Sequence, residues 1–415
     1  MAVSGRRGIP VLLAALITLV CSACGTGVAL KDQNDSTPTG GVIKVGAPYP
    51  LTGAWAENGR NALRGMEVAV KEINASGGIK ALGGARLKIV SADTGSTDPS
   101  QARTATTKLI DTDHVSAVVG SFLSSMSLTV STVAEQSRVP FVTQSLIDQL
   151  VTRGYKYTFK VPANTSATGP AALRAYLDIA ASHGPAPTKV AVFTSNDAAS
   201  KAQSDALRAE AEKRGLSVVA YKAYSPGLTD ASAIVTPLAA AEPEVVFGAG
   251  SVSDLTMIVK NLRDRGIRTP IVGSGGTGFL GKGLKEGLGD ETNGLLAISG
   301  WSDDLKLPGV GQARARYRSQ YHEPFMPNEA GESWVAMHLV AEAMENAHSS
   351  APAAVAKALR ATPATSGPAS SMPPGRVGFD ASGFNSGVVP IMIQWQNGRP
   401  RTVWPASVAT VTPTG

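Results

Sequence analysis

The sequence contains very little cysteine, and none beyond its first few residues. Of its 415 residues only Cys21 and Cys24 are cysteines. A chain with no cysteine after residue 24 has neither a disulfide nor a cysteine metal cluster in its folded part. The remaining thiol, Cys24, is therefore free for another role near the N-terminus.

Charged and aromatic residues are also sparse. Asp, Glu, Lys and Arg make up 17% of the chain, aromatic residues make up 5%, and the formal net charge is +6. The basic residues form no run and are not interleaved with aromatic ones. We therefore expect a solvated surface and no nucleic-acid partner.

The motifs of two enzyme classes are missing or incomplete. The G-x-S-x-G turn of many serine hydrolases is absent, although a catalytic triad assembled only by the fold stays open. The stretch "GTGFLGKG" (276–283) satisfies G-x-G-x-x-G and nearly satisfies a phosphate loop. Gly283, however, stands where that loop needs a hydroxyl to hold magnesium. We interpret the stretch as a glycine-rich loop at a strand end, and we expect no catalytic residue and no cofactor.

Histidine and acidic residues form no convincing metal site. His322 with Glu323, and His338 with Glu342 one helical turn later, are the suggestive pairs. Neither pair has a third ligand nearby, and zinc sites need at least three protein ligands. We expect surface or helix-face positions and no metal.

The first residues are typical of an export signal. Arg6 and Arg7 precede an apolar stretch at 11–20 that is too short for a confident membrane span. Small residues follow before Cys24. We predict a signal peptide over residues 1–23, and a flexible polar tether over residues 24–41.

This N-terminus resembles the signal of bacterial lipoproteins, in which the cysteine after the cleavage point receives lipid. That residue would be Cys24, and the modification would supply the membrane anchor. Cys21 departs from the usual leucine of the motif. Ordinary cleavage after Ala23, without lipid, therefore stays open as the alternative.

From residue 42 onward, short apolar runs alternate with amphipathic segments, and the pattern restarts near residue 188. Strands are predicted at 42–47, 86–92, 116–120, 139–143, 188–195, 216–224, 243–250, 269–275 and 388–395. Helices are predicted at 59–75, 98–112, 124–136, 198–214, 229–240, 252–265, 308–322 and 326–348. Such alternation predicts α/β lobes with parallel sheets covered on both faces. The Pro/Gly/Ser-rich stretch 362–375 is interpreted as a surface loop.

Several stretches together resemble the solute-binding proteins of bacterial ABC importers, of the leucine/isoleucine/valine-binding family (periplasmic binding protein type I). They are "VGAPYPLTGAWAENGRNALRGMEVAVKEINASGGI", "VVGSFLSS", "VPFVTQSLIDQLVTRGYKYTFKVPA" and "FTSNDAAS", in this order. The resemblance implies two doubly wound parallel-sheet lobes, joined by a three-strand hinge, with a ligand cleft between them. Lobe 1 would comprise 42–162 plus 303–384, and lobe 2 would comprise 163–302 plus 385–405.

The same resemblance implies a function without catalysis. The protein would be a monomeric, extracytoplasmic receptor, anchored by lipid to the cell membrane, that closes around a small organic ligand. It would deliver that ligand to an ABC permease. Two alternatives stay open: a ligand-sensing subunit of a membrane receptor, and an exported serine hydrolase.

The resemblance also carries ligand-contact positions onto this chain. They are Trp55, Asn58, Ser124, Ser125, Gln144, Ser145, Leu146, Asp197, Gly250, Gly275 and Trp334. Ser124 and Asp197 also fit the role of helix caps. Trp55 and Trp334 fit ordinary packing equally well.

Family members that bind amino acids hold the ammonium group with an acidic side chain and a tyrosine from the second lobe. Here the corresponding positions fall near Gly275 and Gly250. Burying an ammonium group without a partner is costly. We therefore expect a neutral or carboxylate-bearing ligand with an apolar or aromatic body (an amino-acid-like molecule, a carboxylate or an aromatic amphiphile) rather than a standard zwitterionic amino acid, with Asp197 as the alternative carboxylate.

Overall fold

The computed structural model describes residues 40–275 and 278–414. Cys24, the predicted signal peptide and all but the end of the predicted tether lie outside the described residues. Two residues of the glycine-rich loop, Gly276 and Thr277, also lie outside them. Among the described residues, no helix is both long and apolar enough to cross a membrane.

The first sheet contains five parallel strands in the order β2-β1-β3-β4-β5. Its strands are β1 (Val42–Tyr49), β2 (Arg86–Asp93), β3 (Ala117–Val119), β4 (Phe141–Thr143) and β5 (Thr158–Lys160). The predicted strands of the first half of the chain are confirmed. β5 was not among the predicted strands.

The second sheet contains seven strands in the order β12-β11-β10-β9-β8-β6-β7. Its strands are β6 (Lys189–Ser195), β7 (Ser217–Tyr224), β8 (Val245–Ala249), β9 (Ile271–Gly273), β10 (Leu296–Ser299), β11 (Ile391–Gln396) and β12 (Arg399–Trp404). β6 to β10 are parallel, whereas β11 and β12 are antiparallel to their neighbours. The sheet is therefore mixed at the edge formed by the C-terminal hairpin.

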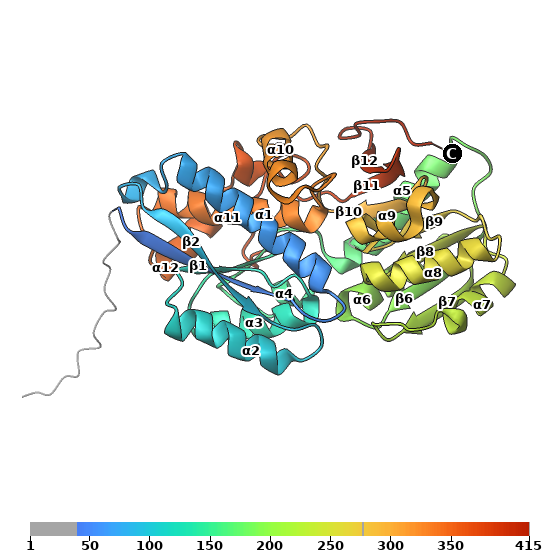
Figure 1. The fold of residues 1–415 in the computed structure, drawn as a ribbon, viewed down its shortest axis with the longest axis horizontal. Coiled ribbons are helices and arrows are strands. Elements are labelled where there is room, and N and C mark those ends of the chain that lie inside the picture. The colour runs from blue at the N-terminus through green and yellow to red at the C-terminus, as the bar shows by residue number, and fades with distance from the viewer. Residues whose placement is uncertain (1–39, 276–277, 415) are drawn as a thin grey trace, which may run out of the picture. The chain divides into compact units, whose positions relative to one another are not determined.

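Helices cover both faces of each sheet (Figure 1). On the first sheet, α1 (Ala56–Ala75) and α11 (Asn328–Ala347) pack together on one face. The opposite face carries α2 (Pro99–Thr107) and α3 (Ser124–Gln136). Three further helices accompany this sheet: α4 (Gln149–Thr152), α10 (Val310–Tyr321) and α12 (Pro352–Ala361).

The second sheet is covered in the same way. One face carries α5 (Thr165–Ala180) and α6 (Ala198–Lys213). The opposite face carries α7 (Ser232–Ala240), α8 (Val252–Asp264) and α9 (Lys282–Leu288). Alternate residues of β6 supply the two cores: Val192 packs with α5 and α6, and Phe193 packs with the helices of the other face. This two-residue alternation is what a strand buried on both faces requires.

The chain passes between the two sheets three times. Residues 161–164 lead from β5 to α5, residues 300–309 lead from β10 to α10, and residues 386–390 lead into β11. Phe384, just before the third passage, forms a bridge beside Lys160 at the end of β5. The predicted two-lobe α/β architecture is confirmed, while the exact lobe boundaries given above remain a prediction.

One expectation about the connections was wrong. The stretch 362–375 is not a simple surface loop, because Ala369, Ser370, Ser371 and Met372 are buried. Its proline and glycine residues form a short 3-10 turn at Pro368–Ser370, beside α11. The proline, glycine and serine residues of this stretch correctly predicted an irregular backbone, but such a composition does not indicate whether the stretch is buried.

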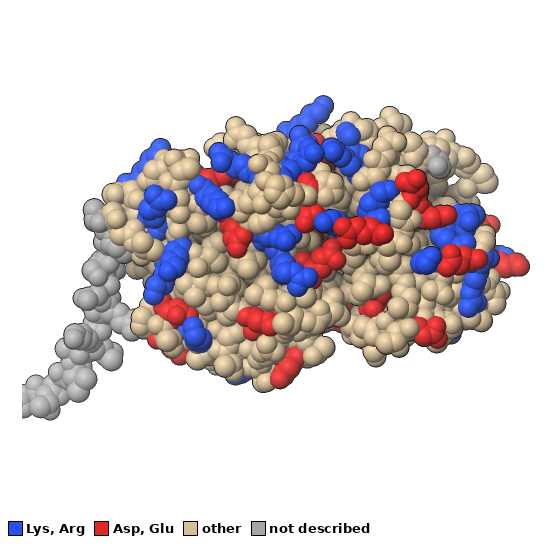
Figure 2. Space-filling view, in the orientation of Figure 1, with Lys and Arg blue, Asp and Glu red and all other residues tan. Residues whose placement is uncertain are grey.

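Charged side chains of both signs lie intermixed on the face shown in Figure 2. No large region of a single sign is visible on this face. This arrangement matches the scattered charges of the sequence, and it suits a soluble surface better than a polyanion-binding one.

Candidate functional site

One pocket lies beyond the carboxyl ends of β3, β4, β6 and β9, where ligands of open α/β sheets usually bind. We call it the Ser124 pocket, and the space around it that no atom fills is about 360 Å³, open solvent included. Its lining residues are Trp55, Phe122, Leu123, Ser124, Gln144, Leu146, Asp197, Ala199, Ser200, Gln203 and Gly275. The first six belong to the lobe of the first sheet and the last five to the lobe of the second.

Ser124 begins α3 at this pocket. Its Oγ lies 2.8 Å from Ser145 Oγ, and both hydroxyls are buried. The preceding residue, Leu123, makes no side-chain hydrogen bond to the first turn of the helix. Backbone N–H groups at the start of α3 are thus left for another acceptor, and the positive end of the helix dipole favours an anionic one.

Asp197 faces the same pocket from the other lobe. Its Oδ1 accepts a hydrogen bond from the Ser200 backbone N–H at 3.0 Å, so it caps α6 as the alternative interpretation proposed. Its Oδ2 is buried and has no partner among the described residues, and burial raises the pKa of this carboxyl. The capping role and a ligand contact are therefore compatible.

Gly275 and Gln203 fit together behind Asp197. A Cβ atom at Gly275 would lie 1.9 Å from Gln203 Oε1, so only glycine leaves room for this amide. The Gln203 Nε2 is buried without a partner among the described residues. Gln203 thus supplies a spare donor to the Ser124 pocket that sequence reasoning did not foresee.

A second pocket adjoins the first and is named here the Glu332 pocket. The space in it that no atom fills is about 400 Å³, open solvent included, and it shares Phe122, Gln144 and Leu146 with the Ser124 pocket. Its other lining residues are Pro162, Ala163, Thr168, Ile298, Ser299, Gly300, Asn328, Glu332 and Pro390. Three of these, Pro162, Gly300 and Pro390, lie on the three passages between the sheets.

Gln144 is held rigidly between the two pockets. Its Nε2 donates to Tyr49 Oη at 3.0 Å and to Ser333 Oγ at 2.6 Å, and these two hydroxyl oxygens lie 3.0 Å apart. The amide oxygen of Gln144 is buried and has no donor among the described residues. The side chain therefore presents a fixed acceptor.

Three ionisable groups are fully buried near the Glu332 pocket. Burial raises the pKa of Glu332 to about 8 and that of Glu329 to about 7, and it lowers the pKa of Lys160 to about 7. Such shifted groups concentrate at functional sites, although buried ion networks also produce them.

Six of the predicted contact residues line the Ser124 pocket. They are Trp55, Ser124, Gln144, Leu146, Asp197 and Gly275. Ser145 is not on the pocket wall, but its hydroxyl contacts that of Ser124. The structure thus brings together residues far apart in the sequence.

Four predicted residues lie away from both pockets. Asn58 is buried and donates to Glu329 Oε1 at 3.1 Å, and Ser125 is half-buried on the outer side of α3. The space that a side chain at Gly250 would need is filled by the Tyr224 hydroxyl, 2.0 Å from a Cβ built there. Trp334 is fully buried, and its indole N–H donates to Glu72 Oε2 at 2.6 Å. Packing, rather than ligand contact, therefore accounts for Trp334.

Sequence reasoning missed Glu332 and Asn328 because it looked for polar contacts only where the resemblance placed them. One signal was present: Glu329 and Glu332 lie three residues apart at the start of a helix that continues with Val335, Ala336 and Leu339. Acidic residues on an apolar helix face are rarely buried without a reason. Asp197 and Glu332 each border a pocket, so each places an acidic group beside one.

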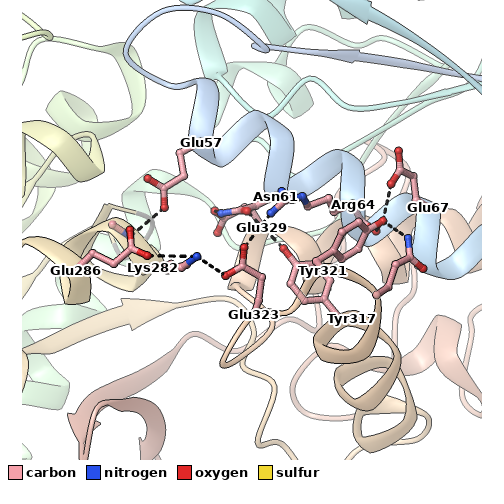
Figure 3. Close-up of polar contacts among 12 residues, drawn as sticks. Glu57, Asn61, Arg64, Glu67, Lys282, Glu286, Tyr317, Tyr321, Glu323 and Glu329 are labelled. Atoms are coloured by element: carbon pink, nitrogen blue, oxygen red, sulfur yellow. Dashed lines mark hydrogen bonds and ion pairs between the residues drawn. The ribbon is translucent and has the colours of Figure 1, made fainter.

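The two lobes also touch through charged groups on α1 and α9 (Figure 3). The Glu57 carboxylate accepts a hydrogen bond from the Gly283 N–H, and Lys282 Nζ lies 3.2 Å from both Glu323 Oε2 and Glu286 Oε1. Arg64 Nη1 of α1 lies 3.2 Å from the other oxygen of Glu323. The described end of the glycine-rich stretch therefore takes part in a contact between the lobes.

A family model described as periplasmic binding protein matches residues 42–394. The chain belongs to the periplasmic binding protein family. The match includes both pockets and all strands except β12 and the end of β11. Members of this family and the similar solved structures are solute-binding proteins, so this periplasmic binding protein is not an enzyme, and the serine hydrolase alternative is set aside.

Three similar proteins illustrate the relationship. The chain is 27% identical over 391 residues to Leu/Ile/Val-binding protein homolog 7 of Brucella abortus, covering 91% of this chain and 95% of the relative. The branched-chain amino acid transporter substrate-binding protein LivJ of Streptococcus pneumoniae, in complex with isoleucine, has a TM-score of 0.76 and 26% identity, covering 88% and 100%. A solute-binding protein of an ABC transporter from R. palustris, in complex with benzoate, has a TM-score of 0.76 and 18% identity, covering 89% and 98%. Membership in the family implies an extracytoplasmic location.

Proposed function

We propose that this periplasmic binding protein is the solute-binding subunit of an ABC importer, which captures a small organic carboxylate by lobe closure and delivers it to the permease. The observation that carries the proposal is the Ser124 pocket, whose wall combines the start of α3 in one lobe with the start of α6 in the other. A ligand held there touches both lobes at once, so binding and closure are coupled. The names of LivJ and of the Brucella relative support a transport role.

The carboxylate is assigned to the start of α3. Ser124 and Ser145 offer neutral hydroxyls, and the first turn of the helix offers backbone N–H groups. Hydrogen bonds from such fixed donors to an ionised acceptor are stronger than those between neutral groups. Trp55 and Phe122, whose ring centroids are 6.0 Å apart, supply an apolar wall for the rest of the ligand.

Solution scattering tests closure. The protein is first screened by thermal shift against a panel of small carboxylates and amino acids, and the radius of gyration is then measured with and without the most stabilising compound. We expect a smaller radius in the liganded protein. An unchanged radius at saturating ligand would contradict a closing cleft.

We also propose that Cys24 carries a lipid anchor, with residues 24–41 as the tether. Replacement of Cys24 by alanine is expected to release the protein from the membrane fraction and to leave ligand binding unchanged. A Cys24→Ala protein that still sediments with membranes would overturn the anchor. The wild-type protein, fractionated in parallel, is the control.

A further inference from the structure

Glu332 is an almost fully buried acidic residue that receives no hydrogen bond from the described residues. Its side chain is 3% exposed, and it lines the Glu332 pocket. Burial and the charge of Glu329 raise the pKa of Glu332, and the charge of Lys160 lowers it. No described residue donates a hydrogen bond to it. A buried carboxylate without a donor is costly, so a protein that keeps one has a use for it.

Lys160 does not fill this role. Its Nζ donates to Pro162 O at 2.9 Å, to Ala163 O at 2.8 Å and to Asn164 Oδ1 at 2.7 Å. An ammonium group has three hydrogens, and all three are used. Lys160 therefore gives Glu332 a nearby positive charge but no hydrogen bond.

Two more acceptors without donors border the same pocket. Asn328 Oδ1 and Gln144 Oε1 are buried, and neither has a partner among the described residues. The pocket hydroxyls do not supply donors, because Ser299 Oγ donates to Trp301 O and Thr168 Oγ1 donates to Asn164 O. Three residues of the pocket wall thus carry oxygen atoms for which no described residue supplies a donor.

We propose that the Glu332 pocket binds the ammonium group of the ligand, with Glu332, Asn328 and Gln144 accepting its three hydrogens. This inference rests on the proposed function, which assigns the carboxylate of the same ligand to the Ser124 pocket. Ser124 does not border the Glu332 pocket, and Glu332 does not border the Ser124 pocket; only Phe122, Gln144 and Leu146 border both. The two charged groups of the ligand are therefore separated by an apolar spacer, as in an ω-amino carboxylate, rather than joined to one carbon.

Asp197 is the competing partner for an amino group. It faces the Ser124 pocket, close to the assigned carboxylate, and would suit an α-amino acid. Its charge, however, is already compensated by the Ser200 N–H and by the N-terminus of α6. Glu332 has the positive charge of Lys160 nearby but accepts no hydrogen bond from the described residues, and this difference favours it as the ammonium partner.

The experiment compares two series of probes by isothermal titration at neutral pH. One series is 4-aminobutanoate, 5-aminopentanoate and 6-aminohexanoate, and the other is the corresponding carboxylates without the amino group. We expect one length of ω-amino carboxylate to bind more tightly than its deaminated counterpart. In the Glu332→Gln protein this advantage should fall by about tenfold or more.

Two variants and one further probe complete the design. Glu329→Gln is the matched control, because Glu329 is buried on the same helix but borders neither pocket. Asp197→Asn and the probe leucine represent the competing site. The inference would be overturned if the ω-amino carboxylate still bound more tightly than its deaminated counterpart in the Glu332→Gln protein. It would also be overturned if only Asp197→Asn removed this difference and leucine bound more tightly than the ω-amino carboxylates. If the carboxylates bind and an amino group brings no gain in affinity, the ammonium site is wrong but the proposed function stands. If no probe binds, the proposed function is contradicted as well.

A thermal melt protects the test against misfolding. Glu332→Gln replaces a carboxylate by an amide of the same shape, so the unliganded variant should melt at or above the temperature of the wild-type protein. A variant that melts well below the wild-type protein, and whose carboxylate binding is lost too, would show that Glu332 holds the fold together and does not serve the ligand.

Discussion

The Glu57 carboxylate of α1 accepts a hydrogen bond from the backbone N–H of Gly283 in α9, with 3.2 Å between the two heavy atoms. Residues 226 positions apart thus join the two lobes. Next to this bond, Lys282 pairs with Glu323 (Figure 3). Because these contacts join the two lobes, we expect lobe opening to break them, so that they stabilise the closed form.

Replacing Lys282 by methionine is expected to weaken ligand binding modestly. Its side chain is 41% exposed, and ion pairs at this exposure contribute little. We expect a loss of affinity of about two- to fivefold, larger at low salt than at high salt, measured by isothermal titration. The control is Lys260→Met, since the Lys260–Asp264 pair lies on α8 alone and is at least 60% exposed. Equal losses in the two variants would show that the contact between lobes does not matter.

The Ser124 hydroxyl is expected to contribute directly to carboxylate binding. Ser124→Ala removes one hydrogen bond to the ligand and the contact with Ser145, so affinity should fall by about two- to tenfold. Ser125→Ala is the matched control at the same helix end, because Ser125 is half-buried and borders neither pocket. If the two variants bind the carboxylate equally well, Ser124 has only a structural role at the start of α3 and does not contact the ligand.

Buried acidic groups should make the stability of the unliganded protein depend on pH. Burial raises the pKa of Glu332 from 4.5 to about 8 and that of Glu329 from 4.5 to about 7. Between pH 4.5 and 8 the folded state therefore binds more protons than the unfolded state, and the free energy of unfolding falls as the pH rises. Lys160, whose pKa is lowered to about 7, acts in the opposite direction above that pH.

Urea denaturation at several values between pH 5 and pH 8 measures this effect. The decline should be shallower in Glu332→Gln than in the wild-type protein. Glu212→Gln is the control, because the Glu212 side chain is 60% exposed on α6 and should leave the slope unchanged. An identical slope in the wild-type and Glu332→Gln proteins would mean that Glu332 is ionised in the folded state over the whole range.

The close approach of α1 and α11 should not tolerate even one methyl group. A Cβ at Gly65 would lie 1.9 Å from the backbone oxygen of Ala330. Gly65→Ala is therefore expected to lower the free energy of unfolding by about 1–3 kcal/mol, measured by urea denaturation. In Gly311→Ala no atom lies within 4 Å of the new Cβ, and this α10 variant should be more stable by up to about 1 kcal/mol. A destabilised Gly311→Ala protein would show that the surroundings of Gly311 on α10 are not open as described.

Sequence periodicity was sufficient to predict the long elements. Helices expected at 308–322 and 326–348 are observed at Val310–Tyr321 and Asn328–Ala347. Their apolar spacing, and the glycine and proline residues around them, determine both the type of element and its ends. In contrast, α5 contains Gly169 and Pro170 near its start, and these residues hid its helical pattern.

The site was predictable only in part, for a physical reason. Ser124, Asp197 and Gly275 follow strands, and residues after parallel strands meet at one edge of a sheet, so their convergence could be anticipated. Trp334 and Glu332 lie two positions apart on α11, and the side that each presents depends on how that helix docks on α1. Tertiary packing places the tryptophan against Glu72 and the glutamate at a pocket, and no local pattern encodes that choice.

Native mass spectrometry of the protein, incubated with a small-molecule extract of bacterial cells, tests the central claim most directly. The account predicts a complex of one protein with one small organic carboxylate, which is released on denaturation and is less abundant in the Ser124→Ala protein. A protein that retains no small molecule from the extract, or whose complex is equally abundant in Ser124→Ala, would contradict ligand capture in this pocket.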